Sequence, residues 1–220
     1  TPDAPINAVA EFTIGLFLCS LRGIHISNQS MTADCKWNRV MGRSISEVTI
    51  GIIGVGKIAT NVITSLINLG ANKIVVNDIH QDLKNFDQKK VNYVSKEYLY
   101  KNSDVISIHV PLTSDTYHLI SDKELSMMKD NAALINTSRG QVVNESDLYS
   151  HLERGRFASV ALDVFENEPY IGPLINFQRC LLTSHISSMT IKTRLLMETQ
   201  AVKDTLLFLR GHSLKNELKY

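Results

Sequence analysis

Val48-Thr-Ile-Gly-Ile-Ile-Gly54-Val-Gly56-Lys-Ile-Ala59 is the most informative segment of this 220-residue chain. Its first part, Val48 to Gly54, is apolar on both faces and predicts a buried strand. Lys57–Leu69 follows with one apolar face and predicts a helix that ends at Gly70. The segment therefore predicts a strand, a glycine-containing turn and a helix in direct succession.

The residues of this turn are those that a dinucleotide phosphate requires. Gly54 permits a tight turn, Gly56 lets a pyrophosphate approach the backbone, and Ala59 lets helix and strand pack closely. A second strand is predicted at Lys73–Asp78, and Asp78 lies 22 residues after Gly56. An acid there accepts hydrogen bonds from ribose hydroxyls and repels a 2′-phosphate, which favours NAD over NADP. The alternative is a tight turn followed by an incidental aspartate.

The rest of the chain continues the alternation of strands and helices. Short strands that are apolar on both faces, separated by helices, indicate a parallel sheet covered on both sides, that is, a doubly wound, Rossmann-like α/β domain over residues 26–190. Further strands are predicted at Asp104–Val110, Ala132–Asn136, Phe157–Phe165 and Cys180–Ser184, and further helices after the capping box Ser121–Glu124 and after Asn144, the latter ending at Gly155.

The two ends of the chain carry long helical patterns. Ala8–Ile24 is apolar around most of its circumference, so it must be covered from more than one side. A second copy related by a two-fold axis or the domain's own sheet could provide this cover, and residues 1–25 are interpreted as a hinge with a candidate dimer-interface helix. Thr190–Arg210 predicts a terminal helix within residues 191–220, with these residues facing inward: Ile191, Leu195, Val202, Leu206 and Leu209.

Composition excludes several classes of protein. The net charge is +1, which gives no reason to expect a nucleic-acid partner. No apolar run reaches the ~20 residues of a membrane span. Cys19, Cys35 and Cys180 are an odd set without a Cys-x-x-Cys pair, which argues against a zinc site or a disulfide framework. Three reduced thiols are typical of a cytoplasmic protein.

Three ionisable residues near predicted strand ends could carry chemistry. Arg139, in Asn136-Thr-Ser-Arg-Gly, could bind a carboxylate through two hydrogen bonds. His185 could exchange a proton near neutral pH, and Glu168 could orient it. Taken singly, each could instead be a structural or surface residue.

Together, these residues resemble the NAD-dependent D-isomer-specific 2-hydroxyacid dehydrogenases, a family that includes D-3-phosphoglycerate dehydrogenase, D-lactate dehydrogenase and formate dehydrogenase. The resemblance runs nearly from end to end. It rests on Thr1-Pro-Asp-Ala-Pro, Asn7-Ala-Val-Ala-Glu11, Trp37, Gly51-Ile-Ile-Gly-Val-Gly-Lys-Ile58, His109-Val-Pro-Leu-Thr113, Asn136-Thr-Ser-Arg-Gly140, Ala161-Leu-Asp-Val-Phe165, Glu168-Pro169 and His185-Ile186.

The resemblance implies a hydride transfer between NAD(H) and a D-2-hydroxy acid or 2-oxo acid, with 3-phosphoglycerate as a candidate substrate. Arg139 would bind the substrate carboxylate, His185 would be the acid/base, and Glu168 would hydrogen-bond His185. Asp163 would help to hold the nicotinamide carboxamide. The full set of cofactor-binding residues implied is Gly54, Gly56, Lys57, Ile58, Asp78, His109, Val110, Pro111, Thr116, Thr137, Ser138, Arg139, Asp163 and His185.

The chain departs from the family pattern in two places within this domain and at its start. Ser187-Ser188 stands where the family usually has Gly-Gly, and Ala59 replaces a third glycine. In the family a substrate-binding domain precedes the hinge that Thr1-Pro2 resembles, and the last helix returns to it. The chain is therefore expected to be the coenzyme domain alone. Two other readings remain open, a dinucleotide-sensing protein like the C-terminal-binding corepressors and an inactive coenzyme module.

Overall fold

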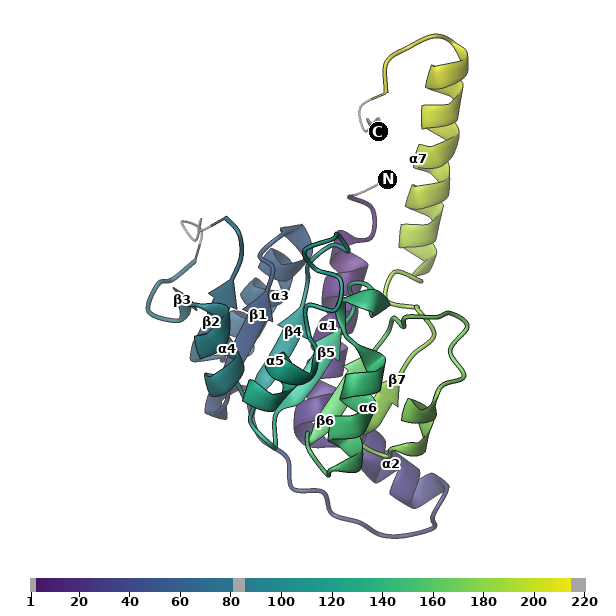
Figure 1. Cartoon of the computed structure of the whole chain (residues 1–220). Coiled ribbons are helices and arrows are strands. Elements are labelled where there is room, and N and C mark those ends of the chain that lie inside the picture. Colours follow the sequence, from purple (N-terminus) through teal and green to yellow (C-terminus); the bar gives the residue numbers. More distant parts are fainter. Residues whose placement is uncertain (1–2, 81–85, 215–220) are drawn as a thin grey trace.

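A single parallel sheet of seven strands organises the chain in the computed structural model, which describes residues 3–80 and 86–214 (Figure 1). The strand order is β3-β2-β1-β4-β5-β6-β7, with every neighbouring pair parallel. This confirms the predicted doubly wound α/β fold. The strands are β1 Thr49–Ile53, β2 Lys73–Asn77, β3 Val91–Tyr93, β4 Val105–Ile108, β5 Ala133–Asn136, β6 Ser159–Leu162 and β7 Cys180–Leu182.

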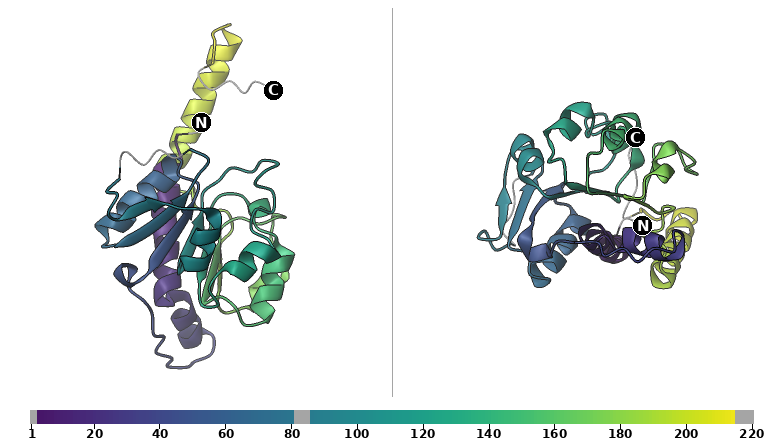
Figure 2. Two further views of the ribbon diagram at one scale, coloured as in Figure 1. Left: turned by 60° about the vertical axis from the view of Figure 1, so that its left-hand side comes forward. Right: turned by 90° about the horizontal axis from the view of Figure 1, so that it is seen from below.

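Helices cover both faces of this sheet (Figure 2). α1 and α3 pack on one face, while α4, α5 and α6 pack on the other, and each layer closes its own hydrophobic core. The strands are buried on both sides, which is why their sequences are almost continuously apolar. The helices are α1 Ile6–Arg22, α2 Ile24–Thr32, α3 Lys57–Asn68, α4 Lys96–Asn102, α5 Asp122–Met127, α6 Glu145–Glu153 and α7 Ile191–Leu209, with short 3₁₀ turns at Ile45–Glu47, Gly140–Val142 and Pro173–Asn176.

The predicted helix starts and stops are confirmed where capping chemistry defines them. Ser121 and Glu124 form the capping box of α5, and the Asn144 side chain accepts a hydrogen bond from the Asp147 N–H at the start of α6. Gly70 and Gly155, which follow α3 and α6, have φ values of 96° and 82°. These left-handed conformations suit glycine and end the helices.

The apolar N-terminal helix is covered mainly by its own domain. Gly23 adopts a left-handed conformation and separates α1 from α2. α1 lies against α3 and the sheet with eight residues buried, so packing within the chain provides most of the cover. Among the described residues no single helix is long and apolar enough to cross a membrane. The α1–α2 pair, bent by 69°, meets that test by length and composition only.

The inward face predicted for the last helix is wrong for the described part of the chain. α7 projects away from the sheet (Figure 1), and Thr193 is its one buried residue among those described. Apolar periodicity shows which side of a helix avoids water, but it does not show that another element covers that side. Exposure reaches 92% for Ile191, 64% for Leu195, 60% for Val202, 46% for Leu206 and 73% for Leu209.

Candidate active site

The turn after β1 has the geometry that a bound pyrophosphate needs. Gly54 has φ +89°, and a Cβ there would lie 2.8 Å from the His109 carbonyl oxygen, so only glycine fits. A Cβ on Gly56 would have no described atom within 4 Å, which leaves its backbone open to a ligand. Ala59 is fully buried where α3 packs on the sheet. The open backbone lies at the N-terminus of α3, where N–H groups and the helix dipole attract an anion.

Asp78 stands at the end of β2 and holds this turn in place. Its Oδ2 accepts a hydrogen bond from the Val55 N–H at 2.6 Å, and its Oδ1 accepts one from the His80 N–H at 2.7 Å. A carboxylate has about four acceptor positions, so both oxygens can still accept from ribose hydroxyls. The residue predicted to bind the ribose therefore also shapes the phosphate turn.

A cavity of about 540 Å³ lies along the carboxyl ends of the strands, beside this turn. Most of the predicted cofactor residues beyond the turn meet on its walls. Doubly wound domains bind ligands in the crevice outside the carboxyl ends of the strands where the strand order reverses, here at β1 and β4. The predicted residues on the wall are Ile58, His109, Val110, Pro111, Thr137, Ser138, Arg139 and His185, and they are joined by Pro5, Val9, Ser187, Ser188 and Met197.

Arg139 reaches the cavity from a turn that a buried asparagine shapes. The Asn136 side chain donates to the Arg139 carbonyl oxygen at 2.9 Å and accepts from the Ser138 N–H and hydroxyl. The Arg139 side chain is exposed, and its Nη1 donates to the Ser138 carbonyl oxygen at 2.6 Å. A guanidinium held in this way offers its remaining donors to a carboxylate.

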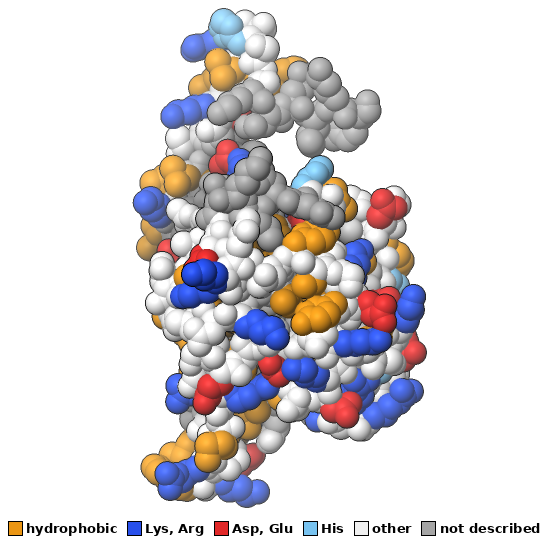
Figure 3. Space-filling view, turned by 90° about the vertical axis from the view of Figure 1, so that its left-hand side faces the viewer, with side chains coloured by type: hydrophobic (Ala, Val, Ile, Leu, Met, Phe, Trp, Pro, Cys, Tyr) orange, Lys and Arg blue, Asp and Glu red, His pale blue; other side chains and the backbone are white. Residues whose placement is uncertain are grey.

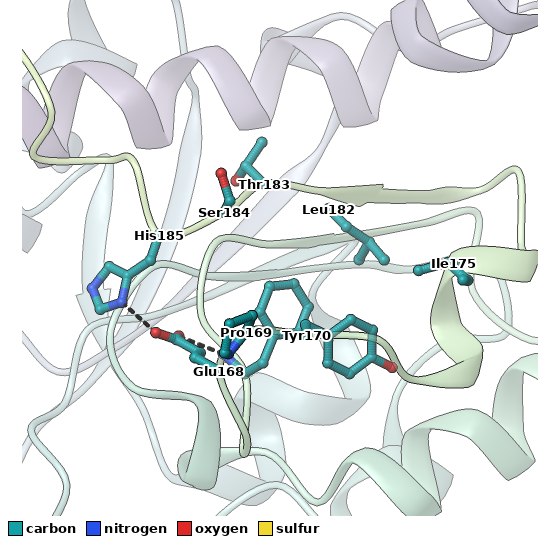
Figure 4. A pocket seen from close by; sticks show the side chains of 9 residues that line it. Glu168, Pro169, Tyr170, Ile175, Leu182, Thr183, Ser184 and His185 are labelled. Carbon is teal, nitrogen blue, oxygen red and sulfur yellow. Dashed lines mark hydrogen bonds and ion pairs between the residues drawn. The ribbon is translucent and has the colours of Figure 1, made fainter.

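His185 and Glu168 form the predicted pair (Figure 4). His185 Nδ1 lies 2.8 Å from Glu168 Oε2, and the Phe165 N–H donates to Glu168 Oε1 at 3.1 Å. Partial burial raises the pKa of Glu168, but the hydrogen bonds from His185 and Phe165 and the charges of His185 and Arg139 outweigh it and hold that pKa below its usual range. Glu168 therefore remains a carboxylate that fixes the His185 ring through Nδ1, and Nε2 has no hydrogen-bond partner among the described residues.

A second, mostly apolar cavity of about 600 Å³ lies on the Glu168 side of the same imidazole. In Figure 4 the Tyr170, Ile175 and Leu182 side chains lie beside it, away from the His185 Nε2 atom. The His185 ring thus stands between two cavities. We call the first the polar cavity, because Arg139 and several hydroxyl side chains line it, whereas the second is more apolar and does not contain Arg139.

His109 enters the polar cavity as a neutral group. Burial lowers its pKa to about 4, and its Nε2 lies 2.9 Å from the Ser107 hydroxyl. A neutral imidazole adds no positive charge beside the phosphate turn at physiological pH.

Apart from Gly54, Gly56 and Asp78, which form the neighbouring turn, three further predicted cofactor residues do not line the cavity. Lys57 is exposed and paired with Asp3 at 2.6 Å. The Thr116 hydroxyl closes its own loop by donating to the Pro111 carbonyl oxygen at 2.6 Å. Asp163 is fully buried, and its carboxylate accepts hydrogen bonds from the Thr183 hydroxyl and the N–H groups of residues 186 and 187 at 2.7–2.9 Å. Asp163 therefore holds the segment around His185 from behind. The predicted hinge, residues 1–2, lies outside the described residues.

Two features of the cavity were not assigned from sequence. The Thr13 hydroxyl on α1 donates to the Val9 carbonyl oxygen and lies 3.0 Å from the Thr137 hydroxyl, which ties α1 to the cavity wall. Nothing in the helical pattern of α1 indicates this contact. Ser187 and Ser188 also line the cavity. Their departure from the Gly-Gly pattern was the signal that could have identified them.

Known proteins are similar to this chain in sequence and in fold. A sequence profile described as "D-isomer specific 2-hydroxyacid dehydrogenase, NAD binding domain" matches residues 14–187. A glyoxylate reductase of Thermofilum pendens is 37% identical over 222 residues, covering 96% of this chain and 64% of that protein. The chain thus spans about two thirds of the length of the curated relatives it matches.

Solved structures of dehydrogenases and reductases are also similar to this chain. A glyoxylate reductase from Paecilomyes thermophila has a TM-score of 0.87 at 33% identity, covering 97% of this chain and 66% of that one. A D-lactate dehydrogenase from Aquifex aeolicus, solved with NAD and lactic acid, has a TM-score of 0.86 at 29% identity, covering 96% of this chain and 68% of that one.

Proposed function

Since the chain belongs to the D-isomer specific 2-hydroxyacid dehydrogenases, whose NAD-binding domain it matches over residues 14–187, we propose that its protein transfers a hydride between NAD(H) and C2 of a small 2-hydroxy or 2-oxo acid. The observation that carries this proposal is the 2.8 Å contact between His185 and Glu168 beside a cavity that also contains Arg139. An acid/base, a residue to orient it and a carboxylate-binding cation are the groups that such a reaction needs.

The residues present fit the dinucleotide. The open backbone of Gly56 and the N-terminus of α3 would hold the pyrophosphate, and Asp78 would hold the adenosine ribose. The polar cavity beyond them would take the nicotinamide, flanked by Thr137 and Ser138. Bound NADH would supply the hydride that reduces C2 of the substrate.

This chain's own groups account for the proton and the orientation. His185 Nε2 would donate a proton to the 2-oxo oxygen during reduction and accept it back during oxidation, while Glu168 stabilises the imidazolium through Nδ1. Arg139 would bind the substrate carboxylate and turn C2 toward the nicotinamide. Asp163 would keep the His185 segment in register through its three hydrogen bonds.

The substrate side chain is proposed to be small. Relatives of this chain are named glyoxylate reductase, hydroxypyruvate reductase and D-lactate dehydrogenase. None of these names supports 3-phosphoglycerate, so 3-phosphohydroxypyruvate belongs among the compounds to be compared with glyoxylate, hydroxypyruvate and pyruvate. The additional length of the relatives would contribute the rest of the substrate cleft.

The test is NADH oxidation with these 2-oxo acids, measured on this chain and on any longer protein that contains it. We expect the 220-residue chain to bind NADH but to turn over slowly, and the longer protein to turn over well. Tight NADH binding with no turnover by the longer protein would contradict the enzyme and favour a dinucleotide-sensing protein.

Variants of the longer protein test the individual roles. His185→Ala should lower kcat by about 10²- to 10⁴-fold with nearly unchanged NADH affinity, because the proton donor is lost while the phosphate turn remains. Arg139→Ala should act mainly through KM for the 2-oxo acid. An active His185→Ala protein would remove the acid/base assignment.

A second copy of the chain is proposed as a partner. The loop after α2 exposes Trp37 by 82% and Met41 by 95%, and Ile24 at the start of α2 is 51% exposed. Hydrophobic side chains also gather at the lower tip of the molecule in Figure 3, where α2 and this loop lie. Light scattering at micromolar concentration would test the dimer, and a Trp37→Ser variant should weaken it. A cytoplasmic location is also proposed, supported by the three free cysteines at 19, 35 and 180.

A further inference from the structure

Glu166 is held from several sides although it lines neither of the two cavities around His185. Its Oε1 accepts hydrogen bonds from His118 Nε2 and from the Glu145 N–H, both at 3.0 Å. Its own N–H donates to the Glu145 carboxylate at 2.6 Å, and its carbonyl oxygen accepts from the Gln141 side chain at 2.9 Å. We call His118, Gln141, Glu145 and Glu166 the Glu166 network.

The proton positions in this network follow from its hydrogen bonds. The Asn144 side-chain oxygen accepts from the Asp147 N–H, so its amide nitrogen is the donor toward His118 Nδ1 at 3.3 Å. His118 Nδ1 is then an acceptor, and its proton lies on Nε2, which donates to Glu166. Burial raises the pKa of Glu145, and the charge of Glu166 adds to this while the Glu166 N–H opposes it. The Glu145 and Glu166 carboxylates lie close together because each accepts a hydrogen bond from the backbone N–H of the other residue.

The network joins the two turns that carry the proposed catalytic groups. Gly140 follows Arg139, and a Cβ on Gly140 would lie 1.9 Å from the carbonyl carbon and oxygen of Phe165. The turn at Arg139 thus packs backbone to backbone against the turn that begins at Phe165. Glu168 hydrogen-bonds the Phe165 N–H and His185, so any movement of this second turn moves Glu168.

We infer that Glu166 is a positioning residue, which keeps Glu168 at His185 and aligns that pair with Arg139. This inference rests on the proposed function for its catalytic meaning, but its geometric part does not require turnover. Misplacement of catalytic groups by about 1 Å can cost on the order of 10²-fold in rate.

Two substitutions separate geometry from charge. Both described hydrogen bonds to the Glu166 side chain use the same oxygen, Oε1. Glu166→Gln keeps a carbonyl oxygen with two acceptor positions and should preserve both bonds, whereas Glu166→Ala loses them. Both variants remove the charge, so a difference between them reports position alone. Glu97→Ala, on α4, is a matched control because it removes an exposed carboxylate.

The first measurement follows the carboxyl carbon-13 resonance of Glu168 against pH in this chain. In the unsubstituted chain and in Glu166→Gln, the pKa of Glu168 should stay below its usual range, since His185 remains its partner. In Glu166→Ala it should rise to that range. An unchanged pKa in Glu166→Ala, or an equal change in both variants, would overturn the inference. Should Glu166→Ala not fold, Gln141→Ala loosens the same turn and is expected to raise the pKa of Glu168 in the same direction.

The second measurement is kinetic and uses the active protein. Glu166→Ala should lower kcat and raise KM for the 2-oxo acid, reducing kcat/KM by about 10- to 100-fold, while Glu166→Gln stays within about threefold and NADH affinity is unchanged. Absence of turnover in every variant, wild type included, would overturn the proposed function and leave the titration to decide on Glu166.

Discussion

His109 is expected to make this domain sensitive to mild acid. Its imidazole is partly buried at the wall of the polar cavity beside Ser107, and this burial lowers its pKa from 6.5 to about 4. Between these two values the unfolded chain binds a proton that the folded chain does not, so the free energy of unfolding falls as the pH decreases. The contribution of neutral His109 to the free energy of unfolding is complete above pH 6.5 and is lost as the pH approaches 4. The full difference is on the order of 3 kcal/mol.

Urea unfolding at about pH 7.5 and about pH 5 measures this effect, with roughly 2 kcal/mol expected to be lost at the lower pH. His109→Gln keeps a polar partner for Ser107 but cannot take up the proton. The loss of unfolding free energy between the two pH values should therefore be smaller in this variant than in the unsubstituted chain, by roughly 2 kcal/mol. His80→Gln, at an exposed loop position, is the control and should behave like the unsubstituted chain. Equal losses in His109→Gln and the unsubstituted chain would refute the reasoning.

Two further changes test the cofactor turn and the packing of the catalytic turns. Asp78→Ser should narrow the preference for NADH over NADPH, because it removes the charge that repels a 2′-phosphate; tighter binding of NADPH by the unsubstituted chain in calorimetry would contradict this. Gly140→Ala should destabilise the domain by about 3 kcal/mol or more in urea unfolding, since its Cβ would lie 1.9 Å from the Phe165 backbone. A loss below about 0.5 kcal/mol would show that the two turns can separate freely.

The sheet could be predicted from sequence because its strands are apolar on both faces. β1, β4 and β5 are mostly apolar, and each is followed by a turn signal. β3 and α4 were missed: β3 has three residues, of which only Val91 is buried, and α4 is a seven-residue helix of mostly polar composition. Elements of three to seven residues carry too few apolar positions to show a period.

The site residues likewise fall into those that a local pattern predicts and those that it does not. Gly54, Gly56 and Asp78 follow a local spacing, so one stretch of sequence predicts them. Glu168 and His185 needed the family pattern, because 17 residues separate them and only the fold shows their contact. The Glu166 network was not predicted at all. Its members bond across 21 to 48 positions of the chain. Glu166 lies between Phe165 and Glu168, inside a segment that the family pattern covers, but the sequence does not show its partners.

The exposure of α7 has a consequence for how the chain behaves in solution. In proteins most of a helix's stability comes from tertiary packing, and α7 gains little from packing on the described part of the domain. Its amides should therefore exchange hydrogen with solvent far faster than those of the buried sheet. Its exposed apolar side chains form a surface on which further copies can pack, so we expect α7 to cause self-association that grows steadily with concentration. A closed dimer would instead stop at two copies.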